Sequence, residues 1–239
     1  MTRSFRIVAT ADLHGHLPDL PDGDLLVLAG DVLRHNRGDT PKSQAVWMQE
    51  HLVPWLDRHG ATAAWRDGYV VLVPGNHDNC LGTETPPAMR IGHEFERFLH
   101  RWNLNMLVRG PVLFDNGLWV QGFAPTPAFE GQNPAAAANS LNDADMRAAV
   151  DRISDGLDLL ITHGPPAGFG DGGFGCPELR DRLSSLDSPP RLHLFGHIHS
   201  AGGTSGEYPW GGRWANVAHV GEDYRPRVAP MTFDLEVRS

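Results

Sequence analysis

Short apolar runs recur along the chain, and each is followed by small and polar residues. Such runs occupy residues 5–11, 25–29, 69–73, 157–161 and 192–195. Consecutive apolar residues, rather than alternating ones, are typical of strands buried on both faces, as in the parallel sheets of α/β proteins. We therefore expect these runs to form the central strands of such sheets.

The segments between these runs carry helical spacing. Residues 41–59 place apolar side chains at helical intervals, and Pro54 is expected to kink this helix. Further helices are expected at residues 92–102, at residues 142–154 and from about Pro177 onward. Alternating strands and helices predict an α/β fold.

Weaker signals complete the expected sheets. Residues 112–114 and 118–123 flank an Asn-Gly turn and predict a hairpin. Late strands are expected at residues 214–217 and 231–237. Residues 124–142 contain three prolines and a run of alanines, so we expect a surface loop there and assign it no function.

The composition is that of an ordinary globular protein, with 41% hydrophobic and 21% charged residues. A length of 239 residues is enough to bury a large core, and we expect a single domain over residues 1–239. The formal net charge is -9, and no Lys/Arg stripe is present, so we expect no stable nucleic-acid partner. An anionic substrate would have to be attracted locally.

The cysteine content and the apolar runs bear on the compartment. Cys80 and Cys176 are far apart in the sequence and form no metal-binding pair, which favours a reducing compartment. No apolar run approaches the length of a membrane span, and the first residues hold too short an apolar stretch for a signal peptide. We expect a cytoplasmic protein with no membrane partner, and the sequence leaves the oligomeric state open.

Polar residues with metal-binding or acid–base chemistry follow the expected strands. Carboxylate, amide and imidazole groups are the donors that divalent ions bind, and open α/β sheets carry their active sites at the carboxyl ends of strands. The i, i+2 spacing of Asp12 and His14, and of His197 and His199, places both members of each pair on one side of an extended segment. The sequence therefore predicts a cluster formed by Asp12, His14, Asp31, Asn76, His77, His163, His197 and His199, and Asp78 can orient the imidazole of His77.

Each motif has a simpler interpretation when taken alone. Asp31 could be a turn carboxylate, and His197 with His199 could be half of a structural zinc site, although no cysteine lies near enough in sequence to complete it. A Gly-Asn-His-Asp loop is by itself only weak evidence for a metal site. Only the convergence of all the strand ends favours a metal site.

Several other residues keep two interpretations. His16, His35 and His219 could line a substrate pocket or be solvated loop residues, and residues 168–175 could form a mobile lid or a loop with tight turns. His193 alternates with leucines in an expected strand, which favours a hydrogen-bonded structural role. The aromatic residues that could either stack on a nucleobase or pack internally are Tyr208, Trp210 and Trp214.

Taken in order, the motifs resemble those of the calcineurin-like metallophosphoesterases. The pattern of that family is Asp-x-His, Gly-Asp, Gly-Asn-His-Asp/Glu, His-Gly and Gly-His-x-His, and all of it is present between residues 12 and 199. Residues 162–166, the glycine-rich stretch that follows them and residues 191–199 are most similar to the MPPED-type class III phosphodiesterase branch. The resemblance implies a four-layer α/β/β/α sandwich with a dinuclear metal site at the strand ends.

The resemblance also implies a role for each site residue. One ion would be bound by Asp12, His14 and His199, and the other by Asn76, His163 and His197. Asp31 would bridge both ions, whose mutual repulsion requires a shared carboxylate, and a bridging hydroxide would attack phosphorus in line. His77 would protonate the leaving alkoxide and Asp78 would orient its imidazole. Manganese is the expected metal, with iron or zinc as alternatives.

The expected activity is hydrolysis of small phosphodiesters such as cyclic nucleotides. Protein serine/threonine phosphatases carry a second aspartate where this chain has Val32-Leu33-Arg34-His35, which disfavours that class. A phosphomonoesterase of the same fold is an alternative. A binding scaffold that has lost its chemistry is a second alternative, but such a protein would have eroded ligands, and here they are intact.

Overall fold

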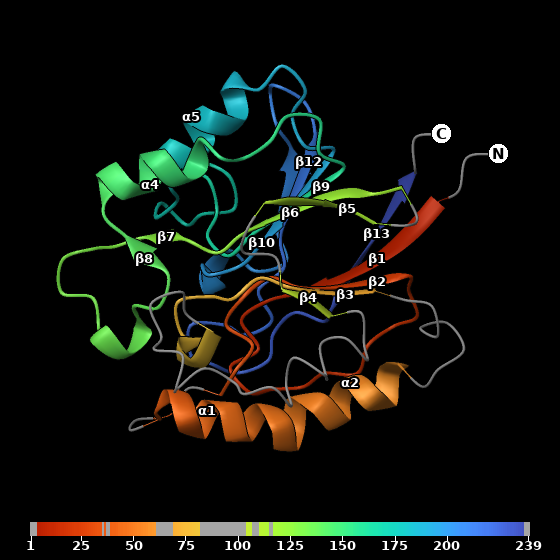
Figure 1. Ribbon diagram of the computed structural model, residues 1–239, viewed down its shortest axis with the longest axis vertical. Helices are drawn as coiled ribbons and strands as arrows, with labels where there is room; N and C mark the ends of the chain where they lie inside the picture. Colours follow the sequence, from red (N-terminus) through yellow and green to blue (C-terminus); the bar gives the residue numbers. More distant parts are fainter. Residues whose placement is uncertain are drawn as a thin grey trace.

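Two mostly parallel sheets pack face to face, and helices cover both outer faces (Figure 1). The computed structural model describes residues 4–34, 36, 39–60, 69–81, 104–106, 110–114 and 117–236. The first sheet has the strand order β13-β1-β2-β3-β4, in which only the β1–β13 pair is antiparallel. Its strands are β1 (Ser4–Thr10), β2 (Leu25–Leu28), β3 (Tyr69–Leu72), β4 (Leu104–Met106) and β13 (Met231–Glu236).

The second sheet has the order β11-β12-β10-β9-β6-β5. Its four central strands are parallel, and the two edge strands pair antiparallel with their neighbours. The β5–β6 pair confirms the predicted hairpin, of whose turn residues 115 and 116 lie outside the described part. The strands are β5 (Pro111–Leu113), β6 (Trp119–Phe123), β9 (Leu159–Thr162), β10 (Leu192–Phe195), β11 (Ser205–Glu207) and β12 (Arg213–Asn216).

The central strands are mostly apolar because each face of each sheet is covered. In β1, Ile7 packs between the two sheets, whereas the next residue, Val8, packs under the outer helices of the first sheet. The same alternation places Leu159 in the core between the sheets and Leu160 under the helices of the second sheet. This double burial explains why the sequence shows continuous apolar runs rather than alternation.

The helical layer on the first sheet is nearly continuous. It consists of α1 (Pro41–Trp47), a π-helical turn (Met48–Leu52) and α2 (Val53–Gly60). Thr40 caps α1 through a reciprocal pair of hydrogen bonds with Ser43. Pro54 is the second residue of α2, and the π-helical turn lies directly before it, so the helix is irregular next to the proline, where a kink was predicted.

The second sheet is covered by α4 (Asp143–Val150) and α5 (Pro177–Ser185). The helix expected at residues 142–154 is α4, which Asn142 caps and which ends at Val150 rather than at residue 154. The thiol of Cys176 caps α5 by accepting a hydrogen bond from the backbone N–H of Leu179 at 3.3 Å. The four layers α/β/β/α are those that were predicted.

Residues 124–142 are more ordered than a plain surface loop, which corrects the expectation for this segment. They form the short parallel pair β7 (Thr126–Pro127) and β8 (Ser140–Leu141), with a 3-10 turn at Pro134–Ala136 between them. The helix expected at residues 92–102 lies outside the described residues. None of the described helices has the length and apolar character needed to cross a lipid bilayer.

Candidate metal centre

The carboxyl ends of the central strands from both sheets meet at one place, and the predicted ligands lie there. Asp12, Asp31 and Asn76 follow β1, β2 and β3 of the first sheet. His163 and His197 follow β9 and β10 of the second sheet. Parallel strands place their carboxyl ends at the same edge, which is why residues so distant in sequence come together.

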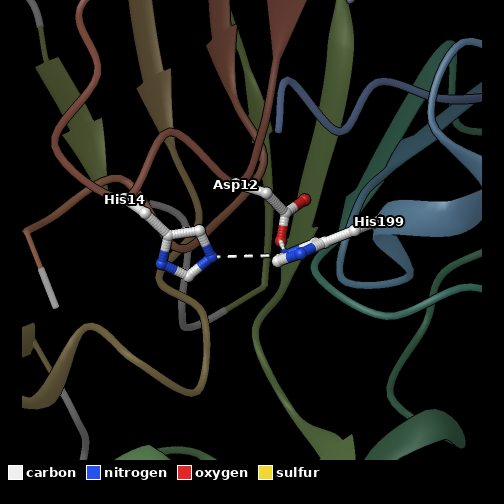
Figure 2. Close-up of side chains that lie close together, drawn as sticks. All are labelled: Asp12, His14 and His199. Carbon is white, nitrogen blue, oxygen red and sulfur yellow. Dashed lines mark hydrogen bonds and ion pairs between the residues drawn. The ribbon is translucent and has the colours of Figure 1, made fainter. Parts of the chain in front are cut away.

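The first group of candidate ligands consists of Asp12, His14 and His199, one ligand atom of each lying within 4.8 Å of the others. The Nε2 atoms of the two imidazoles face each other at 3.3 Å, and Nε2 of His199 lies 3.3 Å from Oδ1 of Asp12 (Figure 2). His14 comes from the first sheet and His199 from the second, so the group exists only where the sheets meet.

The second group consists of Asp31, His163 and His197, again within 4.8 Å of one another. His163 donates from Nδ1 to the carbonyl oxygen of Ala29 at 3.0 Å, which leaves its Nε2 as the available ligand atom. This Nε2 lies 3.0 Å from Oδ1 of Asn76. The orientation of the Asn76 amide follows from its Nδ2, which donates to the carbonyl of Ala136 at 2.9 Å.

Asp31 lies between the two groups. Its Oδ2 is 3.3 Å from Nε2 of His163 and 3.8 Å from Nε2 of His14. Its Oδ1 accepts a hydrogen bond from the backbone N–H of His77 at 2.8 Å. One carboxylate therefore reaches both groups, which is the position of a bridging ligand.

The backbone at this centre is strained. Asp12 (φ 52°), His14 (φ 42°), Asp31 (φ 52°) and His197 (φ 70°) all adopt the left-handed conformation, which costs non-glycine residues on the order of 1–3 kcal/mol each. Such conformations persist where the surrounding structure holds them and where function requires a particular side-chain direction. Here they turn the side chains off the strand ends and toward one another.

Glycines next to the ligands make room for them. A Cβ atom on Gly30 would collide with the ring of His163, and one on Gly75 would collide with the carboxylate of Asp31. A Cβ on Gly196 would likewise collide with a carboxylate, that of Asp12. The Gly-Asp, Gly-Asn and Gly-His steps of the sequence are therefore steric requirements of the centre.

The electrostatics of the centre favour added positive charge. Burial raises the pKa of Asp31, but the neighbouring histidines, His163 first among them, together hold this pKa well below its usual range. Burial lowers the pKa of His163, but Asp31, together with Asp12 and the carbonyl of Ala29, raises this pKa to about 10. Burial also lowers the pKa of His14 and of His197 to about 4, so both imidazoles are neutral at neutral pH.

These residues fit two divalent metal ions. Imidazole nitrogens, carboxylates and one amide oxygen form the donor set, which suits manganese, iron or zinc, and a bound ion would displace the proton that His163 carries at neutral pH. The Nε2 atoms of His14 and His199 face each other at 3.3 Å, and if both are unprotonated neither can donate a hydrogen bond to the other. Both can instead bind one cation through their lone pairs. Buried carboxylates without compensating charge would also be costly.

His77 and Asp78 lie beside these groups. The ring of His77 is 5.0 Å from that of His14 and perpendicular to it, which places His77 at the edge of the first group. The Asp78 carboxylate accepts hydrogen bonds from the backbone N–H groups of Leu33 at 3.0 Å and Gly75 at 2.9 Å. These partners make Asp78 a brace between the loops after β2 and β3, and its role in orienting the imidazole of His77 stays a prediction.

Sequence reasoning missed several residues around the centre. Gln44 is buried in α1, donates to the carbonyl of His77 at 2.8 Å and accepts from the N–H of Cys80 at 3.2 Å. A glutamine on the buried face of a helix was the available signal. Asn139 donates to the carbonyl of Gly75 at 3.1 Å, and no periodic pattern marked it.

His16, His219 and residues 168–175, for which the sequence left a role in substrate binding open, lie in loops. His16 is exposed and its Nε2 lies 3.1 Å from the carbonyl oxygen of Tyr224, while Nδ1 of His219 lies 2.6 Å from the carbonyl oxygen of Val228. His35 lies outside the described residues. Asp171 accepts hydrogen bonds from three backbone N–H groups of the 168–175 loop, which favours a loop with tight turns.

Two more of those interpretations concern residues in the interior of the second sheet. Tyr208 is buried and stacks on Trp210, with ring centroids 4.9 Å apart, which favours packing over nucleobase stacking. His193 is fully buried between Thr162 and Tyr208, in the hydrogen-bonded structural role that was expected.

Comparison with known proteins identifies the family. A family model described as calcineurin-like phosphoesterase matches residues 5–201. The chain belongs to the calcineurin-like phosphoesterase family. Membership confirms the predicted family and makes the chain a metallophosphoesterase of the phosphoric ester hydrolase class, with two candidate metal-binding groups.

Two relatives illustrate the sequence similarity of this calcineurin-like phosphoesterase to known proteins. Metallophosphoesterase domain-containing protein 1 of Homo sapiens is 27% identical over 252 residues, which cover 96% of this chain and 71% of that protein. The probable rhamnogalacturonate lyase C of Emericella nidulans is 31% identical over 209 residues, or 83% of this chain, but the match spans only 17% of that relative. The first of these supports the predicted MPPED-type branch.

A solved structure shows the same fold. The crystal structure of TT1561 of Thermus thermophilus has a TM-score of 0.52 with 13% identity, and the match covers 99% of this calcineurin-like phosphoesterase and 100% of that chain. At this identity the likeness concerns the fold alone.

Proposed function

We propose that the chain is a phosphodiesterase that hydrolyses small phosphodiesters, such as cyclic nucleotides, with two divalent metal ions. The observation that carries this proposal is the pair of ligand groups joined by Asp31, whose Oδ2 lies 3.3 Å from His163 and 3.8 Å from His14. Two adjacent ions with a shared carboxylate are suited to in-line displacement at phosphorus.

Each side chain has a separate task in this proposal. Asp12, His14 and His199 hold one ion, and Asn76, His163 and His197 hold the other. When bound, the ions supply a Lewis acid for the phosphoryl oxygens and lower the pKa of a water molecule so that it becomes the nucleophile. Asp31 contributes to both ion sites, and the hydrogen bond from the N–H of His77 fixes its orientation.

His77 is the proposed general acid. Its ring lies at the edge of the first group, 5.0 Å from the ring of His14, so it can reach an ester oxygen of a substrate held there. It donates a proton to the leaving alkoxide, which is otherwise a poor leaving group. Asp78 supports this step indirectly, because it braces the loop that carries His77.

The test is a substrate panel with protein that has been stripped of metal and reconstituted with Mn²⁺. The panel compares 2′,3′- and 3′,5′-cyclic nucleotides with nucleoside monophosphates and with bis(4-nitrophenyl) phosphate. We expect hydrolysis of the diesters, and loss of that hydrolysis in His199→Ala but not in His51→Ala, which removes an exposed helical histidine. A preference for monoesters would show that the protein is a phosphomonoesterase and not a phosphodiesterase. A folded protein that neither takes up metal nor hydrolyses any ester would be a binding scaffold.

A further inference from the structure

Tyr224 brings an aromatic ring to the edge of the first ligand group. It lies in the segment between β12 and β13, far in sequence from the motifs that define the centre. Its ring centroid is 4.8 Å from that of His14 and 5.2 Å from that of His199, with interplanar angles of 68° and 87°. Tyr224 therefore contacts two of the three residues of this group through their rings.

The backbone conformation of Tyr224 belongs to the same pattern of strain as the metal centre. Among the described residues, six that are not glycine have a positive φ. Four are the predicted ligands Asp12, His14, Asp31 and His197, and a fifth, Asn139, bonds to the loop that carries Asn76. The sixth is Tyr224, with φ 56°, a conformation that is unusual for a bulky side chain.

A tight turn holds Tyr224 in this conformation. Its N–H donates to the carbonyl of Gly221 at 2.9 Å, and the N–H of Gly221 donates to the carbonyl of Arg225 at 2.9 Å. His16 contacts the carbonyl oxygen of Tyr224 at 3.1 Å, and Asp223 pairs with Arg227 at 2.7 Å. A glycine would satisfy this backbone with less strain, so the turn serves to position the side chain.

The ring also remains accessible. Tyr224 is 45% exposed, whereas His14, against which it packs, is 9% exposed. A phosphoester bound at the metal centre would have its organic group next to this partly exposed ring. A tyrosine phenol is neutral at neutral pH, so it adds an aromatic surface beside an anionic substrate without adding negative charge.

We propose that Tyr224 is a specificity residue whose ring packs against the organic group of the substrate and favours phosphoesters that carry a planar heterocycle, such as a nucleobase. The proposal rests on the proposed function, because it takes the substrate to be a phosphoester bound at the metal centre. It adds a preference for nucleotides over phosphoesters that lack a base.

The experiment uses the Mn²⁺-loaded full chain and two ligands that differ only in the base. AMP and ribose 5-phosphate are titrated by calorimetry into the wild type, Tyr224→Phe and Tyr224→Ala, with metal content measured for each. Phe129→Ala is the control, since Phe129 is an exposed aromatic residue on the loop between β7 and β8. Tyr224→Ala is expected to weaken AMP binding about tenfold while changing ribose 5-phosphate binding less than about twofold, and Tyr224→Phe is expected to resemble the wild type.

Four outcomes would overturn the assignment. Equal losses for both ligands, or loss of metal, would mean that the ring only supports the ligand histidines. A Tyr224→Phe variant that behaves like Tyr224→Ala would assign the effect to the hydroxyl, and unchanged AMP binding in Tyr224→Ala would remove Tyr224 from the site. Hydrolysis of bis(4-nitrophenyl) phosphate by the same wild-type preparation tests the proposed function separately.

Discussion

At the scale of single residues, Asp31 is the point on which both ligand groups depend. Its carboxylate is buried, which raises its pKa, but the neighbouring histidines together hold this pKa well below the usual range, and its Oδ2 faces a histidine of each group. Removing its negative charge should therefore weaken both ion sites at once.

Asp31→Asn is expected to lose metal as well as activity. The amide keeps the shape of the side chain but not its charge, so we expect less than a full complement of Mn²⁺ and a fall in kcat/KM of more than about 100-fold. Metal analysis after gel filtration and diester hydrolysis give the two readouts. Asp22→Asn, at an exposed position, is the matched control, and a variant with both ions and normal turnover would contradict the bridging role.

His77→Ala should separate proton donation from metal binding. We expect metal content to be retained, a loss of about 10²–10⁴-fold for diesters with alkyl leaving groups and a much smaller loss for nitrophenyl esters, because a nitrophenolate leaves without a proton. Steady-state rates on a matched pair of alkyl and nitrophenyl esters provide the comparison. Similar losses on both would exclude general acid catalysis by His77.

The grouping of the candidate metal ligands was predictable because each one follows an apolar run at a conspicuous spacing, as Asp12 and His14 do. The partners of Asp78 were not, because the N–H groups that it binds belong to the backbone, and backbone direction is not encoded in a local pattern. Tyr224 was missed for a related reason. Nothing in a loop sequence indicates that a tyrosine will adopt φ 56° and turn toward a distant histidine.

At the scale of elements, a buried chain of hydrogen bonds joins the carboxyl end of β9 to the start of β10. Thr162 donates from Oγ1 to the carbonyl of Gly164 at 2.6 Å, so this hydroxyl must accept from Nε2–H of His193, at 2.9 Å. Nδ1 of His193 then accepts from the hydroxyl of Tyr208 at 2.7 Å. The chain fixes a neutral His193 and braces the strand end from which His163 projects.

His193 should make the fold sensitive to acid. Burial lowers its pKa from 6.5 to about 3, so the unfolded chain binds a proton below pH 6.5 that the folded chain does not bind until about pH 3. The contribution of His193 to the free energy of unfolding is therefore fully present above pH 6.5 and is lost as the pH falls. The loss is up to about 1.4 kcal/mol per pH unit and amounts to about 2 kcal/mol at pH 5.

His193→Gln removes this titration while keeping a hydrogen-bond donor. We expect the variant to be less stable at pH 7.5 but to lose less stability between pH 7.5 and pH 5 than the wild type does. Denaturant unfolding at both pH values measures the difference, and the comparison cancels the titration of the metal-site histidines. An identical pH dependence in the two proteins would show that His193 does not remain neutral in the fold.

The apolar runs predicted the central strands because those strands are buried on both faces, as the alternation of Ile7 and Val8 between two cores shows. The same reasoning could not find β7 and β8, which contain two residues each and so have no periodicity. It also placed the end of α4 at residue 154 rather than at Val150, since helix ends depend on local capping more than on the apolar pattern.

At the scale of the whole molecule, the metal centre is shared between the two sheets. The first group combines Asp12 and His14 with His199, and the second combines Asp31 with His163 and His197, so each group takes ligands from both sheets. Bound ions should therefore stabilise the contact between the sheets as well as the loops.

Removal of metal is expected to lower the melting temperature. An ion that binds the folded state alone stabilises it by about 2.7 kcal/mol at a free concentration of 100 times Kd, and it also offsets the buried charge of Asp31. Scanning calorimetry with EDTA, and again after addition of excess Mn²⁺, should show a reversible fall and recovery. The melting temperature of Asp31→Asn should change little with EDTA or Mn²⁺. A wild-type melting temperature that does not change with EDTA would contradict the proposed ion sites.

The pairing of β1 with β13 determines when the first sheet can be completed. Ser4 pairs with Glu236, so strands from opposite ends of the described chain lie side by side (Figure 1). A contact of this sequence separation closes late, because a long loop must be ordered before the pairing contributes any stability. During synthesis the edge of the first sheet therefore stays open until β13 has been made, whereas all the predicted ligands have been made once the chain reaches His199. Metal uptake by a nascent chain would thus report the meeting of the two sheets and does not require the completion of the first one.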